Sequence, residues 1–240
     1  MHSKLSNPSK EDVLNHLNNQ ITLTHKQISE SSHIIITLGT AWVYKYLERE
    51  LIVANCHKLP QKQFEKKLLT VEEVTASLKN ILSLIRSVNY NAQVIFTVSP
   101  VRHIKDGFVE NTQSKSHLIA AIHNVLSDSR SLSGVEAGSL SEVEVYFPSY
   151  EIMMDELRDY RFYKEDMIHP NQTAINYIWK KFVQVWISEK SFTTMDEVET
   201  IQKALQHKPF NPSSKAHLKF LDQIETKKYN LQANFPHIIF

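Results

Sequence analysis

Short apolar runs alternate with longer segments of helical periodicity along most of this 240-residue chain. The runs at 33–38 and 93–100 are continuous and rich in β-branched residues, which predicts buried strands of a parallel sheet. A third strand is predicted at 143–147, and 51–56 is a candidate for a further short strand. Because helical segments separate these runs, the pattern predicts an α/β fold with a three-layer open parallel sheet flanked by helices.

Helical periodicity is clearest at 70–88, where the apolar residues share one face and Thr70 and Glu73 stand at the spacing of a capping box. Further helices are predicted at 10–29, 111–128, 149–157 (a helix or turn), 171–189, 194–207 and 213–229. The last two are expected to form an antiparallel pair, since a tail of about 50 residues buries little surface alone. We therefore expect an α/β domain over 1–190 and a helical extension over 191–240 that docks on it.

Composition and charge disfavour several classes of function. The formal net charge is +1, so no nucleic-acid or anionic-membrane partner is expected. No apolar run approaches the roughly 20 residues that cross a bilayer. The single cysteine, Cys56, fits a reducing compartment, and we expect a cytoplasmic protein unless a leader precedes a truncated start. The twelve histidines show no metal-ligand spacing and the four glycines form no phosphate-binding loop, so no metal or other cofactor is expected.

The most distinctive stretch is 160–171, YRFYKEDMIHPN, which contains Asp166 and His169 in a D-x-x-H-P pattern. An imidazole that acts as a base needs a carboxylate to fix its tautomer and to stabilise the imidazolium. Two side chains three residues apart on a tight turn can meet without help from the rest of the fold. The pattern therefore makes this pair a candidate catalytic couple. The alternative is a helix-cap region, in which an acidic residue precedes Pro170 and backbone groups satisfy His169.

Six blocks carry a resemblance to a known family. They read TLGTAWVY (37–44), ANCHKLP (54–60), TVSPVRH (97–103), NTQSKSHLIAA (111–121), YFPSYEIMMDELRDYRFYKEDMIHPN (146–171) and HKPFNP (207–212). This set, in this order, resembles the GSCFA family, which is placed among the SGNH-like hydrolases. The resemblance implies an SGNH or flavodoxin-like fold and hydrolysis of an acyl ester by a serine, with His169 as the base and Asp166 as its orienting carboxylate. The substrate would be a small ester or an acetylated carbohydrate.

The family is named after an N-terminal Gly-Ser-Cys-Phe-Ala motif, and these 240 residues do not contain it. The serine of that motif takes the place of the SGNH nucleophile. The stretch His2-Ser3-Lys4 resembles an internal part of the family domain, so Met1 is expected to match an internal position, as in a truncated product, a misassigned start or a natural half. In the SGNH fold the strand that delivers the serine lies inside the sheet. A different strand, a partner chain, a second copy of this chain or a rearrangement is therefore expected to fill its place.

The missing motif leaves the enzymatic status of the chain open, because a base without a nucleophile is idle. One expectation is a serine ester hydrolase that is weak or inactive alone. The alternative is a non-catalytic module that binds a carbohydrate or acyl ligand, or another chain.

The first predicted strand leads into a candidate oxyanion loop. This turn consists of Gly39, Thr40, Ala41 and Trp42. The resemblance places the SGNH block G-x-N-D here, whose asparagine donates to the oxyanion. Ala41 has no side-chain donor, so backbone N–H groups or the side chains of Asn55 and His57 would have to serve. The alternative is that the turn is tight and that Trp42 packs in the core.

Arg102 and His103 follow the strand predicted at 93–100, and loops at the carboxyl ends of parallel strands form the sites of open α/β sheets. Arg102 could hold a carboxylate or a phosphate of the substrate. The alternative is that it ties loops together by pairing with an acidic residue of a later segment: Asp155, Glu156 or Asp159. Ser99 is the one serine at a strand end that could replace the missing nucleophile.

Overall fold

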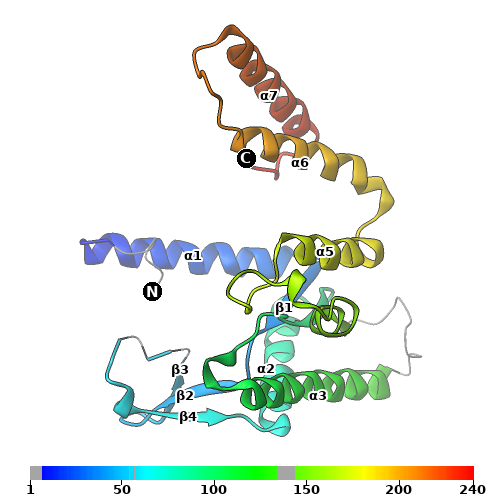
Figure 1. Ribbon diagram of the computed structural model, residues 1–240. Coiled ribbons are helices and arrows are strands. Elements are labelled where there is room, and N and C mark those ends of the chain that lie inside the picture. Colours follow the sequence, from blue (N-terminus) through cyan, green and yellow to red (C-terminus); the bar gives the residue numbers. More distant parts are fainter. Residues whose placement is uncertain (1–6, 54, 57, 134–143) are drawn as a thin grey trace. The chain divides into compact units, whose positions relative to one another are not determined.

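The computed structural model describes residues 7–53, 55–56, 58–133 and 144–240. The chain divides into two compact units, Met1–Ile178 and Trp179–Phe240. Figure 1 shows all the labelled strands in the first unit and the helices α6 and α7 in the second.

The described strands are β1 (His33–Leu38), β2 (Trp42–Tyr46), β3 (Leu51–Val53), β4 (Phe64–Leu68), β5 (Gln93–Val98) and β6 (Glu144–Phe147). The described helices are α1 (Lys10–Glu30), α2 (Val71–Val88), α3 (Phe108–Ser133), α4 (Ser149–Glu151), α5 (Gln172–Trp186), α6 (Phe192–Gln206) and α7 (Lys215–Asn234). A π-helical turn, Ile152–Glu156, continues α4. Each predicted helix and strand has a counterpart here, whereas the sequence pattern predicts neither β2 nor β4.

The first sheet is parallel and has the strand order β1-β5-β6. β5 lies in the middle, and five of its six residues are buried, as expected for a strand covered on both faces. Val94, Phe96 and Val98 pack with the apolar faces of α2 and α3 in the main core. On the opposite face, Thr97 Oγ1 lies 2.6 Å from Ser149 Oγ at the start of α4. This parallel sheet between helices confirms the predicted fold class.

β1 is an edge strand among the strands that the structure describes, because it pairs with β5 alone. Its residues alternate between exposed and half-buried, and Ile35 is 52% exposed. The prediction of a buried strand at 33–38 is therefore wrong for one face of β1. A continuous apolar run suits a strand that is covered on both sides, but the covering elements are supplied by the tertiary structure.

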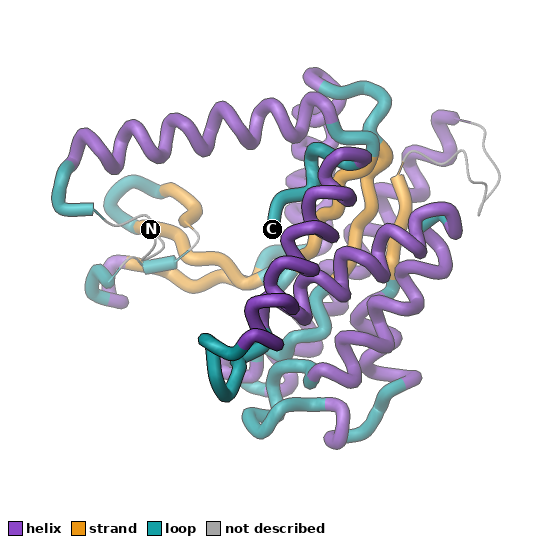
Figure 2. Tube along the Cα trace, turned by 90° about the horizontal axis from the view of Figure 1, so that it is seen from above, coloured by secondary structure: helices purple, strands orange, loops and turns teal. Residues whose placement is uncertain are grey.

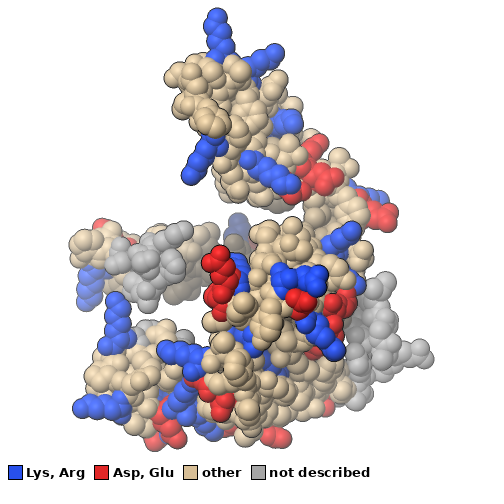
Figure 3. Space-filling model, viewed as in Figure 1, with Lys and Arg blue, Asp and Glu red and all other residues tan. Residues whose placement is uncertain are grey.

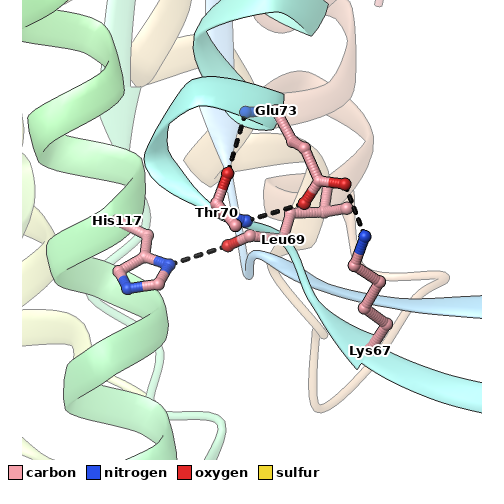
Figure 4. Close-up of polar contacts among 5 residues, drawn as sticks. All are labelled: Lys67, Leu69, Thr70, Glu73 and His117. Atoms are coloured by element: carbon pink, nitrogen blue, oxygen red, sulfur yellow. Dashed lines mark hydrogen bonds and ion pairs between the residues drawn. The ribbon is translucent and has the colours of Figure 1, made fainter.

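The link between β4 and α2 is fixed by the polar contacts drawn in Figure 4. Thr70 Oγ1 accepts a hydrogen bond from the Glu73 N–H (3.2 Å), and the Glu73 carboxylate accepts one from the Thr70 N–H (2.9 Å). This is the predicted capping box. Lys67 pairs with the same carboxylate, and His117 Nδ1 on α3 donates to the Leu69 carbonyl oxygen (2.7 Å). These contacts attach the start of α2 to α3.

The second sheet is antiparallel, with the strand order β3-β2-β4, and Figure 2 shows it extending away from the first sheet. β2 begins at Trp42, so only residues 39–41 link the two sheets. Tyr44 and Tyr46 pack on Phe64 across β2 and β4, with ring centroids 6.5 and 5.3 Å apart. The sequence does not predict β2 and β4 because lysine and glutamate interrupt their apolar residues, as in WVYKY and FEKKL.

The first helix, α1, buries none of its residues. Ser9 caps it by accepting a hydrogen bond from the Asp12 N–H (3.2 Å). Near its other end, Asn89 Nδ2 donates to the carbonyl oxygens of Ile28 and Ser31, at 2.8 Å each. The described contacts of α1 are therefore largely polar rather than contacts of a shared core.

The second unit is built around α6 and α7, which pack against each other (Figure 1). Ile201, Ile224 and Leu231 form its buried core, and Phe235 and Phe240 from the C-terminal segment pack on that core. These helices confirm the two predicted at 194–207 and 213–229. The boundary at 190/191 and the docking of the extension stay predictions. None of the described helices has the length and apolar character needed to cross a bilayer.

Candidate functional site

The structure brings Asp166 and His169 into direct contact. His169 Nδ1 lies 2.7 Å from Asp166 Oδ2, with the two side chains 51% and 43% exposed. The other carboxylate oxygen, Oδ1, accepts hydrogen bonds from the backbone N–H groups of His169 (3.0 Å) and Ile168 (2.9 Å). These two backbone bonds, and then the imidazole, lower the pKa of Asp166 to about 2. The carboxylate is therefore ionised at neutral pH.

An ionised carboxylate can only accept hydrogen bonds, so His169 Nδ1 must carry the proton in this contact. In a neutral imidazole the other nitrogen, Nε2, is then an acceptor. In the helix-cap alternative, backbone groups would satisfy His169. Here the backbone N–H groups donate to Asp166 instead. The pair thus has the hydrogen-bonding pattern of a base held in one tautomer by a carboxylate.

The loop around the pair is fixed by its own backbone. Lys164 N–H donates to the His169 carbonyl oxygen (2.8 Å) and closes the loop, and Met167 adopts a left-handed φ of 57° at its tip. Asn171 then caps α5 by accepting a hydrogen bond from the Ala174 N–H (3.1 Å). Its Nδ2 group also donates to the Arg161 carbonyl oxygen (2.6 Å). The sequence H-P-N therefore ends the loop and starts the helix in a defined position.

Arg102 joins the loop after β5 to the loop that carries His169. Its backbone N–H donates to the Ile168 carbonyl oxygen (3.2 Å), and its Nη1 donates to the Met167 carbonyl oxygen (3.0 Å). Three aromatic rings surround its guanidinium, with the Cζ atom 5.4–5.9 Å from their centroids: Phe108, Tyr160 and Tyr163. Arg102 therefore joins two loops, as the structural alternative predicts. It does so by hydrogen bonds to carbonyl oxygens and by contacts with aromatic rings.

The acidic partners predicted for Arg102 are engaged by other residues. Asp155 pairs with Arg158 (2.9 Å) and Asp159 pairs with Arg161 (3.1 Å). Within the described residues, the structure shows no ion pair between Arg102 and a carboxylate. The third predicted acid, Glu156, accepts a hydrogen bond from the Tyr177 hydroxyl. The ion pairing predicted for Arg102 is therefore not seen among the described residues.

A buried lysine, Lys115 of α3, holds the ends of β1 and β5. It is 1% exposed, and its Nζ donates to the carbonyl oxygens of Gly39 and Ser99, both at 2.7 Å. Nζ also lies 5.7 Å from the centroid of the Tyr150 ring. Burial lowers the pKa of Lys115 to about 8. A cation thus lies under the loops where sites of open α/β sheets form.

Sequence reasoning did not single out Lys115, although the pattern of α3 contains a signal. Asn111, Ser114 and Lys115 are all buried, and Leu118 and Ile122 continue the same core-facing row. Polar residues at the i, i+3, i+4 spacing of an apolar stripe indicate buried polar groups that need partners. Their partners, however, lie on β1 and β5 and are not evident from the helix sequence alone.

His103 and Gly39 meet beside this lysine. A Cβ atom added at Gly39 would lie 3.5 Å from His103 Nε2, so the backbone of the turn approaches the imidazole closely. Burial lowers the pKa of His103 first, and the positive charge of Lys115 lowers it further. Asp106 has a smaller, opposing effect, and His169 adds to the lowering. His103 is therefore mostly a neutral imidazole at neutral pH.

The turn after β1 faces α3. Ala41 N–H donates to Ser114 Oγ (2.7 Å), and Trp42 N–H donates to Thr40 Oγ1 (3.1 Å). Trp42 Nε1 donates to the Glu110 carbonyl oxygen (3.3 Å). These bonds use the backbone N–H groups of Ala41 and Trp42, so at these two positions the geometry favours the tight-turn reading. A role for Thr40 or Trp42 in substrate binding stays a prediction.

The remaining predicted residues are not brought to the pair by a described contact. Asn55 follows β3 in the second sheet, and His57 lies outside the described residues. Ser99 Oγ accepts a hydrogen bond from the Val101 N–H (3.3 Å) in its own loop. Among the described residues, no group of three or more histidine, cysteine, aspartate or glutamate side chains could hold a metal ion. The assembled site therefore consists of Asp166 and His169 with Arg102, His103, Gly39 and Lys115.

Comparison with known proteins identifies the family. The sequence matches the GSCFA family over residues 1–182 and the C-terminal domain of GSCFA domain proteins over residues 198–240. No curated protein matches it.

Proposed function

Because the chain belongs to the GSCFA family, we propose that its site is that of an SGNH-like acyl-ester hydrolase. His169 acts as the base, and Asp166 holds it in the reactive tautomer. The observation that carries this proposal is the 2.7 Å contact between His169 Nδ1 and the ionised carboxylate. The substrate is a small ester or an acetylated carbohydrate.

The chemistry of the pair is proton transfer. A hydroxyl nucleophile would lose its proton to His169 Nε2 as it attacks the ester carbonyl, and the imidazolium that forms would be stabilised by Asp166. Among the described residues, no serine hydroxyl forms a hydrogen bond with the imidazole. We therefore propose that this chain alone hydrolyses esters weakly or not at all, since a serine has to be supplied to the pair.

His103 supports the same assignment from the other side of the site. Its imidazole is neutral at neutral pH and lies against the backbone of Gly39. A neutral imidazole keeps one N–H group, which can donate a hydrogen bond to a developing oxyanion. We assign His103 a role in binding the ester group, in place of the asparagine that Ala41 replaces.

The test is the hydrolysis of p-nitrophenyl acetate by the purified chain. A slow, single-phase rate above buffer is expected, and His169→Gln should lower it more than His16→Gln does. His16→Gln is the matched control, because His16 is exposed on α1 and any surface imidazole attacks this ester slowly. A rate that His169→Gln leaves unchanged would show that the pair is not the base. A burst that survives Ser99→Ala would reveal a covalent nucleophile other than Ser99 and overturn the expectation of weak activity.

A second function, that of an interaction module, is favoured by the free edge of β1. Among the described strands nothing pairs with that edge, and Ile35 on it is 52% exposed. An edge strand presents unpaired N–H and C=O groups that another strand can bind. We propose that a second copy of this chain, or a partner chain, adds to the sheet there.

This proposal predicts self-association of the purified chain at micromolar concentrations, measured by light scattering after gel filtration. Ile35→Lys should give a monomer, because a charged side chain on an edge strand opposes pairing. Ile21→Lys on α1 is the control, since Ile21 is 67% exposed and lies outside the sheet. A wild-type monomer, or an Ile35→Lys protein that associates as strongly as wild type, would rule out pairing between copies.

A further inference from the structure

A small cavity opens beside the loop that carries His169. It has a volume of about 240 Å³, below the ~300–1,000 Å³ of pockets for drug-sized ligands. It is lined by Arg102, Met153, Met154, Arg158, Asp159, Tyr160 and Tyr163. Its walls are thus methionine and tyrosine side chains with three charged groups, which suits a small ligand that has one charged end.

Two of the three charged lining groups already have ion-pair partners. Arg158 pairs with Asp155 (2.9 Å), and Asp159 accepts hydrogen bonds from the backbone and guanidinium of Arg161 (2.8 and 3.1 Å). Arg102 is the lining cation for which the described residues supply no carboxylate. Its guanidinium has five N–H donors, of which the described contacts use one, toward the Met167 carbonyl oxygen.

The guanidinium of Arg102 is held in place without an acid. The rings of Phe108, Tyr160 and Tyr163 lie 5.4, 5.9 and 5.5 Å from its Cζ atom, and cation–π contacts of this kind favour arginine. A planar fork that is already oriented loses little conformational entropy when it binds a planar anion. On the visible face of the first unit, basic and acidic side chains are interspersed (Figure 3), so attraction for an anion would come from this one group rather than from a broad positive surface.

The position of Arg102 connects the cavity to the candidate catalytic pair. Its backbone and side chain both donate to the loop residues that immediately precede His169, namely Met167 and Ile168. A ligand held by the guanidinium would therefore contact the loop that carries His169, whereas the His169 side chain itself does not line the cavity. An ester bond on that ligand would have to extend beyond the cavity to meet the imidazole.

We infer that Arg102 and this cavity form a subsite for a carboxylate, so that the substrate is an ester whose acyl or sugar part carries a carboxylate group. The position of the ester rests on the proposed hydrolase function, whereas carboxylate binding itself does not. A single planar guanidinium matches the two oxygens of a carboxylate. A dianionic phosphate would need further donors, and the other lining arginine, Arg158, is occupied by Asp155.

The experiment measures the binding of sodium glucuronate by calorimetry or protein-observed NMR, with glucose at matched ionic strength as the uncharged comparison. Wild type should bind glucuronate and not glucose. Arg102→Met should weaken glucuronate binding about tenfold or more, as expected for loss of a charge-assisted bidentate contact. Arg49→Met is the charge-matched control, because Arg49 is exposed in the β2–β3 turn, and it should leave the affinity within about twofold of wild type.

Two further variants keep the test decisive. Arg102→Lys retains the charge and should bind glucuronate with intermediate affinity, which separates the subsite from a misfolded loop. His169→Gln should bind glucuronate as wild type does, so a failure of the hydrolase proposal leaves the subsite standing. Glucuronate affinity that is unchanged in Arg102→Met, no binding by wild type, or inorganic phosphate binding as tightly as glucuronate would each overturn the assignment.

Discussion

The two polar centres at the carboxyl edge of the first sheet are built in opposite ways. The Asp166–His169 pair is about half exposed and joins side chains three residues apart. Lys115 is 1% exposed, and its ammonium joins carbonyl oxygens that lie 76 and 16 residues away. The pair forms within one loop, whereas the lysine contacts form only after α3 has packed on β1 and β5. A candidate catalytic couple can thus be local while the scaffold that positions it depends on the whole sheet.

Water acts differently on the two centres. Solvent screens the exposed pair, so it contributes little to the stability of the fold. The buried ammonium has lost its hydration and depends on the two strand-end carbonyl groups, which depend on it in turn. A substitution of Lys115 should therefore lower the stability of the fold strongly, whereas a substitution of Asp166 should lower it little.

The largest effect is expected from Lys115→Met. The side chain keeps its length, but the carbonyl groups of Gly39 and Ser99 lose their donor, at about 1–3 kcal/mol for each buried group. Relief of the buried charge offsets part of this cost, which leaves a loss of about 2–3 kcal/mol in the free energy of unfolding. Urea denaturation measures it.

The control for Lys115→Met is Lys79→Met on α2. Lys79 is 52% exposed and pairs with Asp128 at the surface, so its removal should change stability by less than about 0.5 kcal/mol. Equal urea midpoints for the Lys115 and Lys79 variants would contradict the contrast between the two centres.

An effect of similar size is expected from pH. Burial lowers the pKa of Lys115 from 10.5 to about 8, so between these values the unfolded chain binds more protons than the folded one. The contribution of Lys115 to the free energy of unfolding therefore rises with pH through that window. At pH values below the window, the protein bears the full cost of burying the charge. Relative to Lys115→Met, wild type should gain about 2–3 kcal/mol from the bottom of the window to the top. Parallel urea curves for the two proteins at every pH would show that the ammonium is not buried in solution.

The smallest effect is the titration of Asp166. Its pKa is lowered from 3.8 to about 2, chiefly by the backbone N–H groups of His169 and Ile168. The stabilisation from this carboxylate is complete at pH values above its ordinary pKa. It is lost as the pH falls through the pKa that the group has in the folded chain. The carboxyl ¹³C shift should titrate near pH 2, and His169→Gln should raise the midpoint only in part because the backbone bonds remain. A wild-type midpoint at the ordinary ~3.9 would mean that the loop is open.

The elements that sequence predicted best are those whose pattern is complete within one segment. Thr70 and Glu73 form the predicted capping box, and β5 is buried on both faces as its run of β-branched residues suggests. The elements that the sequence predicted poorly depend on which strands lie beside them. β1 has a similar apolar run but lies at an edge, and β2 is held in a sheet by β3 and β4 despite its interrupted pattern.

By itself, the sequence determined the α/β class, the family and the contact between Asp166 and His169, because each depends on periodicity, on long blocks or on residues within one turn. The tertiary structure decided that Lys115 lies under Gly39, that His103 is neutral beside it, and that Arg102 meets rings and carbonyl groups instead of the acids predicted for it. These contacts join residues far apart in the chain. Their partners are therefore set by how the strands and helices pack, and burial then sets the charge of each group.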